Sequence, residues 1–497
     1  MPFNIPYISQ VHLPIEIWQE IIKYLEKQEL HALSKTSAIL RNASLPFLFH
    51  TARFDAKDSA GLRHLAEVYV HKRAVSKNIA ELHLDYETAL HNSKGKFWAT
   101  VGIIWAEAGI YTGIERSRMS RLTTLVLHNV MLVEVWMHSI LKSRTLRRLH
   151  LHTCWCDKWT KPFPPTTVSE LVIQDIYYTQ EFEALAIFLS PQVVELEVHG
   201  KDWPMSLPTV FPETCPRLRK YVFRLPIGSS RSLINSLREF LIRAITIEDL
   251  ELCVGFFPDT LPLPPSALPN LRLYDATLIT GFLATKFITG PQKLGTLRIR
   301  DDFVQSYDPH SIQNSLDVSY EVSELHLALH HHNPALFMAQ VDWRFPNIEG
   351  LHLSIRAKQF HVLSRDDPNV FIDHPALNSI LDGLSDFVNV VKAAYPTQEG
   401  DNDCSRRLGL HQLKKIEVDV DVGNIGTTPE VFEKWFHDVV TANCPALKEA
   451  HFRVWKVNKQ GIREVGTRFW ARWHLGIDEH WHYEGGYISE QEGKVLT

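Results

Sequence analysis

Cysteine is scarce in this chain. Six cysteines are scattered among 497 residues, and no Cys-x-x-Cys pattern occurs. A disulfide scaffold is therefore not indicated, and the cysteines are best interpreted as reduced thiols. The first 30 residues also lack a basic start followed by an apolar run, the pattern of a signal peptide. We therefore expect the protein in the cytoplasm, the nucleus or both.

An excess of positive charge and a long apolar run are also missing. Lysine and arginine number 52 against 57 aspartates and glutamates, so the formal net charge is −5. This balance argues against nucleic acid or an acidic membrane as the partner. The apolar stretch at 97–114 is interrupted by Glu107, and its uninterrupted part is too short for a membrane span. We expect neither nucleic-acid binding nor membrane insertion.

Motifs of catalysis are absent as well. The chain has no Gly-x4-Gly-Lys phosphate loop, no Gly-x-Ser-x-Gly elbow and no His-Glu-x-x-His motif. Histidines gather at 330–332 and 474–482, and either group could bind a metal. Neither group has an established ligand spacing, which favours solvated or packed histidines. We predict no catalytic residue, no metal site and no cofactor, so the protein is not expected to be an enzyme.

One apolar pattern is present along most of the chain. Apolar-x-x-apolar-x-apolar occurs thirteen times from Ile79 to Phe452, and between positions 125 and 351 its middle residue recurs every 21 to 29 residues. This is the period of a leucine-rich repeat, in which each unit supplies one strand of a parallel stack. Only 146–154, ending at Cys154, has the full consensus. An ordinary parallel α/β sheet would also have apolar strands, but the narrow period favours a curved solenoid.

Residues between the apolar positions of each strand should face away from the core, because successive strand side chains point to opposite faces. These residues are polar, mixed in charge and rich in histidine. Such a surface suits a protein partner better than a nucleic-acid backbone, which needs one sign of charge. Each position could equally be a solvated strand residue. The candidate target-binding residues are His150, His152, Glu195, Glu197, Arg272, Arg298, Arg300 and His326.

Two gaps interrupt the repeat, which we expect to span residues 53–455. Residues 86–120 are expected to form an irregular repeat, and residues 355–410 an insertion with a helix at 376–395. Amphipathic patterns predict further helices at 229–244 and 428–440. Because a terminal repeat needs a covering element, the aromatic-rich residues 456–497 are predicted to be a C-terminal cap.

The segment before the repeats is predicted to contain about three short helices between residues 13 and 50. In the first, Ile17, Trp18, Ile21, Ile22 and Leu25 form a face wider than packing on one core requires. About forty residues bury too little surface to be stable alone. These helices need a partner, which is either a second protein or the repeats, since the N-terminal repeat also requires a cap.

The residues of this segment follow a known pattern in order and spacing. They are Leu13-Pro14, Glu16, Ile21-Ile22, Leu25, Leu30, Leu33-Ser34, Thr36-Ser37, Leu40-Arg41, Leu45-Pro46 and Leu48-Phe49. In these residues the segment resembles an F-box. An F-box at residues 11–52 followed by repeats implies an α/β protein with an N-terminal three-helix F-box and a curved leucine-rich-repeat-like α/β solenoid with a parallel sheet.

The resemblance also implies a function. F-box proteins with repeats are substrate receptors of cullin–RING (SCF-type) E3 ubiquitin ligases. The F-box would dock on the adaptor subunit, and through it on the cullin and RING subunits, while the repeats hold an unidentified target protein. The alternative is a non-degradative protein-interaction scaffold that does not join a ligase. The predicted adaptor-binding residues are Leu13, Pro14, Ile17, Trp18, Ile21, Leu25, Leu30, Leu33 and Leu40.

Overall fold

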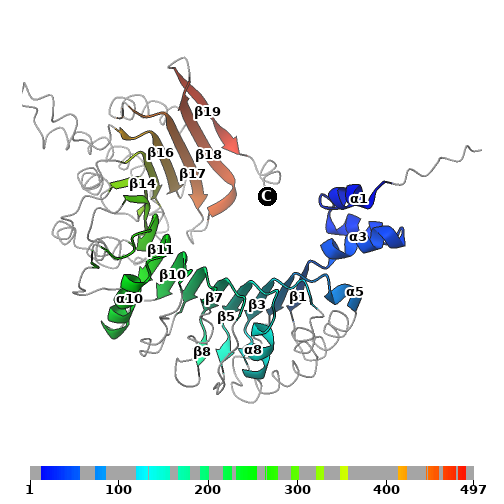
Figure 1. Cartoon of the computed structure of the whole chain (residues 1–497). Coiled ribbons are helices and arrows are strands. Elements are labelled where there is room, and N and C mark those ends of the chain that lie inside the picture. The colour runs from blue at the N-terminus through cyan, green and yellow to red at the C-terminus, as the bar shows by residue number, and fades with distance from the viewer. Residues whose placement is uncertain are drawn as a thin grey trace, which may run out of the picture. The chain divides into compact units, whose positions relative to one another are not determined.

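The computed structural model divides into two compact units, residues 1–218 (unit 1) and residues 219–497 (unit 2), each described here by itself (Figure 1). Several predicted features lie outside the residues that the structure describes. Almost all of the irregular repeat at 86–120 and of the insertion at 355–410 does so. The same holds for the whole of the predicted helices at 376–395 and 428–440 and of the histidines at 330–332. The described residues are 13–55, 73–85, 119–132, 134–156, 166–178, 191–200, 216–225, 231–254, 263–264, 266–277, 293–300, 321–329, 348–355, 412–422, 444, 446–457, 463–476 and 480–488.

Unit 1 begins with three short helices, α1 (Ile15–Ile22), α2 (Lys27–Leu33) and α3 (Ala38–Leu48). Helix α2 starts with a capping box, in which the backbone N–H of Glu26 donates to the Glu29 carboxylate at 2.8 Å. Helix α3 starts at Ser37, whose hydroxyl accepts from the backbone N–H of Leu40 at 3.1 Å. This cap confirms the helix start predicted at Thr36-Ser37. In the part of the chain that the structure describes, no helix has the length and apolar content to cross a membrane.

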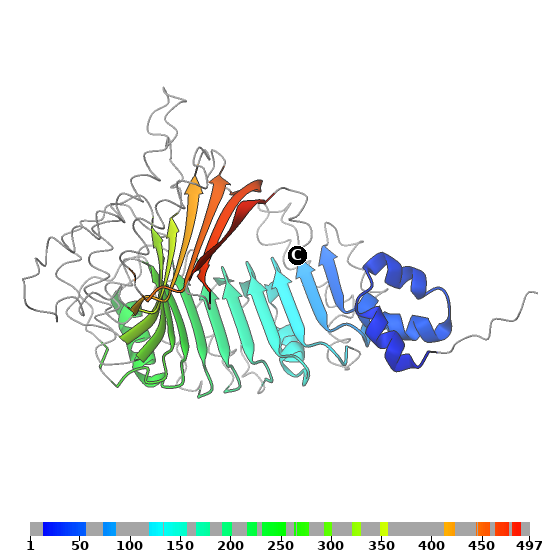
Figure 2. The same cartoon turned by 90° about the horizontal axis from the view of Figure 1, so that it is seen from above.

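Parallel strands follow the helices in unit 1. Their hydrogen-bonded order is the chain order, and Figure 2 shows them as a row of arrows pointing the same way. Helix α8 (Glu134–Leu141) lies beside these strands and contributes the fully buried Met137 and Ile140. A shorter helix, α5 (Arg73–Ser76), precedes the second strand. The strands are β1 (Thr51–Asp55), β2 (Glu81–Asp85), β3 (Thr124–His128), β5 (Arg148–His152), β7 (Glu170–Gln174) and β9 (Glu195–His199).

Each of three successive strands ends in the same turn. Asn129, Thr153 and Asp175 follow β3, β5 and β7, and their φ angles of 57°, 53° and 48° lie in the left-handed region. The N–H of Asn129 donates to the carbonyl of His152 at 2.9 Å, and the other two bond to the following repeat in the same way. The chain then forms the short strands β4 (Met131–Leu132), β6 (Trp155–Cys156) and β8 (Tyr177–Tyr178), which pair in parallel.

Cys154 occupies the consensus position that ties consecutive repeats together. Its side chain is fully buried, and its Sγ lies 3.4 Å from the carbonyl oxygen of Leu127 in the preceding repeat. Val130 and Ile176 take the same place in the neighbouring repeats and are also buried. Burial raises the pKa of the Cys154 thiol to about 12. The thiol is therefore structural rather than reactive.

We expect Cys154 to resist thiol reagents in the native protein. With a pKa of about 12, its thiolate fraction at neutral pH is on the order of one in ten thousand or less. Labelling with a maleimide, followed by mass spectrometry of the peptide that contains Cys154, should show modification only after denaturant is added. Labelling of the native protein at the rate of a free exposed thiol would contradict this.

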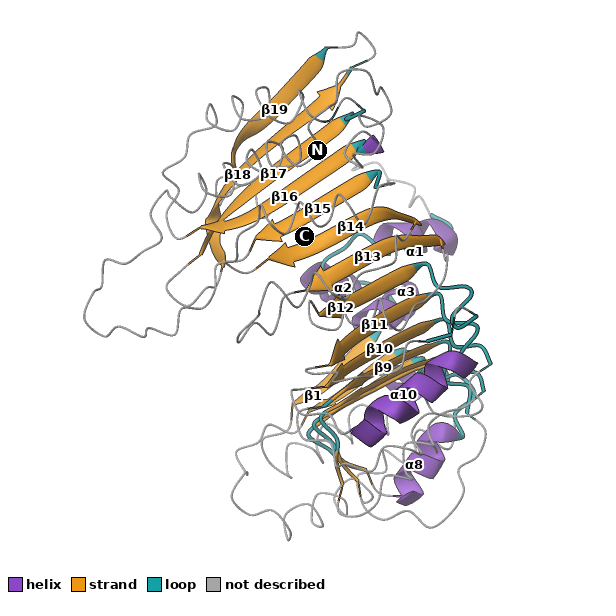
Figure 3. Cartoon of the chain, turned by 90° about the vertical axis from the view of Figure 1, so that its left-hand side faces the viewer, coloured by secondary structure: helices purple, strands orange, loops and turns teal. Residues whose placement is uncertain are grey.

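Unit 2 contains a second set of parallel strands, and Figure 3 shows them with helix α10 (Arg231–Arg243) on one face. The ring of Phe240 on α10 packs edge-on against Tyr221 on the first strand, with centroids 5.1 Å apart. Helix α10 confirms the prediction at 229–244. The strands are β10 (Lys220–Leu225), β11 (Asp249–Val254), β12 (Leu273–Thr277), β13 (Lys293–Arg300), β14 (Glu321–Leu329), β15 (Gly350–Ile355), β16 (Lys415–Val422) and β17 (Glu449–Val457).

The predicted fold class is confirmed: helices at the N-terminus are followed by a parallel-sheet solenoid of mixed α/β structure. The predicted register is wrong at β12. The pattern at 268–273 placed Arg272 and Tyr274 on the face away from the core, but Tyr274 pairs with the buried Leu250 and Leu297 and is itself buried. In the structure, the apolar motif of this repeat begins three residues later, at Leu271. The sequence has apolar residues that fit the motif from either Leu268 or Leu271.

The last two strands reverse the direction of the sheet. Strands β18 (Arg463–Leu475) and β19 (Trp481–Ile488) pair antiparallel, β18 with β17 and β19 with β18. Trp473 on β18 is fully buried, and its ring packs on Phe452 at a centroid distance of 5.4 Å and on Tyr483 at 5.2 Å. Trp473 thus links β17, β18 and β19 through aromatic contacts across neighbouring strands.

Candidate protein-interaction surfaces

Helix α1 carries two apolar stripes that face in different directions. Trp18 and Ile22 are four residues apart on α1 and Leu25 follows the helix, and all three belong to the core of the three-helix bundle. Leu30 and Ala43 supply the opposing buried side chains. This inward stripe holds α1, α2 and α3 together.

The second stripe points away from this core. Ile17 and Ile21 are four residues apart on α1, Leu13 precedes the helix and Tyr24 follows it; all four side chains are exposed, and we call them the outward stripe. Ile17 is 46% exposed and Tyr24 is 86% exposed. Solvent-exposed apolar side chains in one row are typical of a helix that another protein covers. In the described part of the chain, these side chains stay exposed.

The sheet of unit 1 has one buried and one partly exposed face. Leu82, Leu125 and Leu149 are fully buried on the first face. Residues that alternate with them, such as His83 and His150, are half-buried. We call the second face, made by the alternate residues of β2, β3, β5, β7 and β9, the unit-1 open face.

Histidines orient carboxylates on the unit-1 open face. His128 Nδ1 lies 2.8 Å from an Asp85 oxygen, and His150 Nε2 lies 2.9 Å from a Glu170 oxygen. An ionised carboxylate can only accept a hydrogen bond, so each ring nitrogen here carries the proton. Arg148 also binds Glu170, at 2.8 Å. These contacts therefore hold the two carboxyl groups in a fixed orientation.

Two histidines on this face have lowered pKa values. Burial is the main cause for His152, and the nearby His150 and His128 add to it, with the rings of His150 and His152 6.1 Å apart. Burial followed by the charge of Arg53 lowers the pKa of His83. Both side chains are therefore held in the neutral form at neutral pH.

Acidification should destabilise the protein through His152. Because its pKa is lower when folded than the ordinary 6.5, the unfolded chain binds the proton first. Its contribution is complete above about pH 6.5 and is lost as pH falls from there through the folded pKa. Denaturant unfolding at about pH 7.5 and pH 5.5 should show a smaller loss of stability in His152→Gln than in the wild type. An equal or larger loss in the variant would contradict this assignment.

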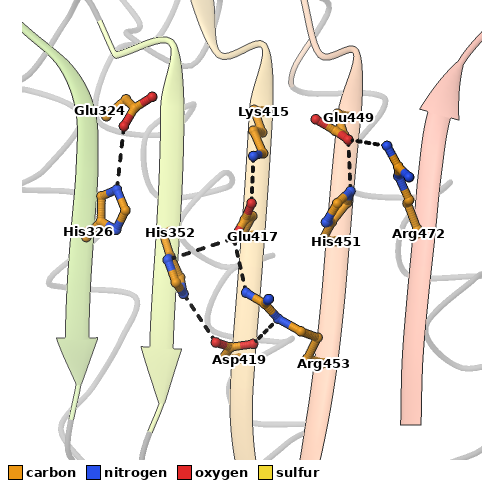
Figure 4. Close-up of polar contacts among 10 residues, drawn as sticks. All are labelled: Glu324, His326, His352, Lys415, Glu417, Asp419, Glu449, His451, Arg453 and Arg472. Carbon is orange, nitrogen blue, oxygen red and sulfur yellow. Dashed lines mark hydrogen bonds and ion pairs between the residues drawn. The ribbon is translucent and has the colours of Figure 1, made fainter. Parts of the chain in front are cut away.

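The alternate residues of β13 to β18 form a corresponding surface, the unit-2 open face, whose polar contacts Figure 4 shows. Arg453 binds Asp419 at 2.5 Å and Glu417 at 3.1 Å, so one guanidinium joins β17 to two carboxylates of β16. Lys415 binds Glu417 at 2.7 Å. His352 lies 3.3 Å from Asp419. On this surface, lysine and arginine pair with Glu417 and Asp419, whereas Glu324 lies 3.7 Å from His326.

This pairing shifts the pKa values of two carboxyl groups. Burial alone would raise the pKa of Glu417 and Asp419, but hydrogen bonds and positive charges outweigh it, from Lys415 for Glu417 and from His352 and Arg453 for Asp419. The net result is a lowered pKa for both carboxyl groups. They are ionised at neutral pH and matched by cations.

Comparison with known proteins identifies the helical segment. The family model of the F-box domain matches residues 11–50. Residues 11–50 are an F-box domain. The match covers α1, α2 and α3, and therefore both apolar stripes. At the family level, an F-box domain indicates an adaptor-binding substrate receptor of the SCF type, and such receptors are in general non-catalytic. No curated protein matches the chain.

The predicted adaptor-binding residues divide between the surface and the core of the F-box domain. Leu13, Pro14, Ile17 and Ile21 are exposed. Trp18, Leu25, Leu33 and Leu40 are half-buried. Leu30 is only 6% exposed and lies inside the bundle, in one core cluster with Ile22 and Ala43. Its contact with the adaptor stays a prediction.

Sequence reasoning missed three exposed apolar residues of the F-box domain. They are Ile15, Tyr24 and Ile39, and Ile39 is 64% exposed on α3. Tyr24 lies after the end of α1 at Ile22, so helical spacing does not reveal its exposure. Ile39 lies in a different helix, and only the packing of α3 reveals its exposure.

The predicted target-binding residues fall on separate surfaces. His150, His152, Glu195 and Glu197 lie on the unit-1 open face. Arg298 and His326 are neighbours in the register of β13 and β14 on the unit-2 open face. Arg272 precedes β12, near Glu248 at 3.9 Å, so it does not join Arg298 in one basic patch. The side chain of Arg300 lies outside the described residues.

Histidine clusters do not form a metal site in the described part of the chain. No group of three or more histidine, cysteine, aspartate or glutamate side chains there is placed to hold a metal ion. His474 and His482 stack across β18 and β19 with ring centroids 5.2 Å apart. The described histidines of the 474–482 segment are thus partly engaged in packing.

Proposed function

We propose that this chain is the substrate-recognition subunit of an SCF-type E3 ubiquitin ligase. Its F-box domain docks on the adaptor subunit, and the adaptor connects it to the cullin and RING subunits. The chain itself is not an enzyme and acts in the cytoplasm, the nucleus or both. Other subunits carry out ubiquitin transfer.

The observation that carries the proposal is the outward stripe of the F-box domain. Leu13, Ile17, Ile21 and Tyr24 expose apolar surface on and beside α1, although the bundle already has its own core. Burying such a row against helices of a second protein is favourable by roughly 25 cal/mol per Å² of apolar area. A helix that presents anchors at i, i+4 and i+7 is a known mode of protein recognition.

The repeats supply the target-binding part of the proposal. Residues 53–455 form the repeat domain after the F-box at 11–52, and residues 456–497 cap it. The candidate target contacts are on the open faces: His150, His152, Glu195 and Glu197 in unit 1, and Arg298 and His326 in unit 2. The half-burial of these polar side chains on a sheet face is consistent with a protein-binding surface.

The alternative function is a protein-interaction scaffold that binds the adaptor, or no adaptor, without joining a ligase. Affinity purification of the full chain from cells discriminates between the two. Recovery of adaptor, cullin and RING subunits together supports the ligase receptor. Recovery of adaptor without cullin, or of neither, supports the scaffold. An Ile17→Asp chain purified in parallel should lose all three subunits, whereas the matched Gln19→Asp chain, which adds the same charge on another exposed side of α1, should retain them.

A further inference from the structure

The strands of unit 1 begin at an edge that carries basic charge alone. We call the described residues that lead into β2, β3, β5, β7 and β9 the entry edge, which lies at the tails of these arrows in Figure 2. It comprises residues 77–80, 119–123, 142–147, 166–169 and 191–194. These described residues include five basic side chains and no acidic one. The basic residues are Lys77, Arg121, Lys142, Arg144 and Arg147, all of which are exposed.

Four of these residues, all except Lys77, belong to the segments that lead into β3 and β5, and we call them the basic cluster. The backbone N–H of Arg147 donates to the carbonyl oxygen of Thr123 at 2.8 Å, so the two segments lie side by side. Arg121 is two residues before Thr123, and Arg144 is three residues before Arg147. Because neighbouring strands lie about 4.8 Å apart, long side chains from both segments can reach one bound group.

The basic cluster has no acidic partner in the described part of the chain. Arg147 Nη1 donates to the carbonyl oxygens of Arg144 at 3.1 Å and of Thr167 at 3.4 Å. These uncharged acceptors orient the guanidinium group without cancelling its charge. None of the four residues forms an ion pair with a described residue. Their positive charge is therefore not neutralised within this part of the protein.

Carboxylates at the starts of the strands do not offset this charge. Strands β2, β7 and β9 begin with Glu81, Glu170 and Glu195, and β5 begins with Arg148, which pairs with Glu170 at 2.8 Å. Counting these four residues together with the entry edge gives a formal charge of 6 − 3 = +3. The described start of the unit-1 sheet therefore stays positive when its nearby carboxylates are included.

The corresponding edge of unit 2 pairs its charges between repeats. Glu248 directly precedes β11 and lies 3.7 Å from Arg219 and 3.9 Å from Arg272, which belong to the repeats on either side. Glu349 precedes β15 and lies 2.7 Å from Lys414, which precedes β16. The repeats that flank β5 in unit 1 have threonine and serine at this place, so they supply no such carboxylate. The fold accommodates acidic residues at this edge, but the basic cluster is without them.

We infer that the basic cluster binds an aspartate- or glutamate-rich segment of the target protein. This inference rests on the proposed function and adds the chemistry of one part of the target. A guanidinium group presents N–H donors in a planar fork that matches a carboxylate, and charged hydrogen bonds are stronger than neutral ones. Three arginines and one lysine on adjacent segments can therefore hold several carboxylates of one chain.

A nucleic acid fits this edge less well than an acidic protein segment does. Proteins that bind single strands combine a basic groove with aromatic side chains on which bases stack. The described residues of the entry edge include no aromatic side chain. The whole chain also has a formal net charge of −5, which disfavours the long-range attraction of a polyanion. A protein segment needs only a local match of charge, which the basic cluster supplies.

Fluorescence anisotropy with three labelled probes tests the inference. The first is a peptide that alternates aspartate and glutamate with serine, and the second replaces every acidic residue with lysine. The third is a single-stranded oligonucleotide with the same number of negative charges as the acidic peptide. At about pH 7.5 and about 0.15 M salt, the purified full chain should bind the acidic peptide more tightly than the oligonucleotide, and should not bind the basic peptide.

Charge variants locate the site. Arg121→Gln/Arg144→Gln removes two side chains that bind no described residue, and it should weaken binding of the acidic peptide at least about fivefold. Lys414→Gln/Lys448→Gln removes the same charge from exposed residues that precede β16 and β17 in unit 2. This control should change affinity less than about twofold, as a loss of net charge alone would. Thermal unfolding of both variants should match the wild type, because all four side chains are exposed.

Three results would overturn the inference. They are no binding of the acidic peptide, binding of the basic peptide or the oligonucleotide at least as tight as that of the acidic peptide, and equal losses in the two double variants. Recovery of adaptor, cullin and RING subunits from cells is measured with the same chains. If the subunits are recovered and the peptide result is negative, the inference fails and the proposed function stands. If the subunits are not recovered, the proposed function fails independently of the peptide result.

Discussion

Ile17→Asp/Ile21→Asp is expected to abolish adaptor binding, with a loss of affinity of roughly a thousandfold or more. Two central apolar anchors of an interface typically cost about 2 kcal/mol each when removed, and every 1.4 kcal/mol is tenfold in affinity. Both side chains are exposed in the free chain, so charging them should leave the fold of the F-box domain intact. Calorimetry with purified adaptor measures the change.

The matched control for this variant is Gln19→Asp/Gln28→Asp. It adds the same two negative charges at exposed positions outside the outward stripe. Its affinity for the adaptor should stay within a few-fold of wild type, because surface charges away from a contact have small effects. Comparable losses in both double variants would mean that charge, rather than the apolar row, governs binding.

Trp473→Ala should produce the largest loss of stability in unit 2. The side chain is fully buried between Phe452 and Tyr483, and its removal leaves a large cavity where β18 joins β17. Replacing a buried tryptophan by alanine typically costs about 3–5 kcal/mol. Chemical denaturation, monitored by a spectroscopic signal from unit 2, should show this loss of stability.

Trp470→Ala is the matched substitution on the same strand. Trp470 is half-buried, so its removal should cost less than half as much as removal of Trp473. Adaptor affinity should be unchanged in both variants, since the F-box domain lies in the other unit. Equal stability losses for the two tryptophans would contradict the assignment of Trp473 to the core of β17 to β19.

The strands of the repeats could be predicted because their burial pattern has a short local period. In "RLHLH", Leu149 and Leu151 are fully buried and the residues between them are not, as expected for a strand with one covered face. The error at β12 has the same origin. "LPNLRLYDA" contains two overlapping frames of apolar residues, and only pairing with β11 selects the one in which Tyr274 is buried.

The F-box domain shows a second limit of sequence reasoning. Spacing predicted a wide apolar face on α1, but it did not divide that face into Trp18, Ile22 and Leu25 inside and Ile17 and Ile21 outside. The division depends on where α2 and α3 place Leu30 and Ala43. Contacts between helices, rather than properties of α1 itself, decide which side remains exposed.

The C-terminal strands were not predicted as strands at all. Residues 463–475 are rich in aromatic and basic residues, and no repeat motif continues into them. Their antiparallel pairing depends on the neighbouring β17, where Phe452 meets Trp473. We predicted that residues 456–497 cap the end of the repeats, and this role stays a prediction.

The structure of the chain bound to the adaptor subunit tests the central claim most directly. The account predicts that Leu13, Ile17, Ile21 and Tyr24 become buried against helices of the adaptor, while Trp18 and Ile22 keep their present contacts. A complex in which these four side chains remain exposed to solvent would contradict it, because the apolar row on α1 would then have no part in docking.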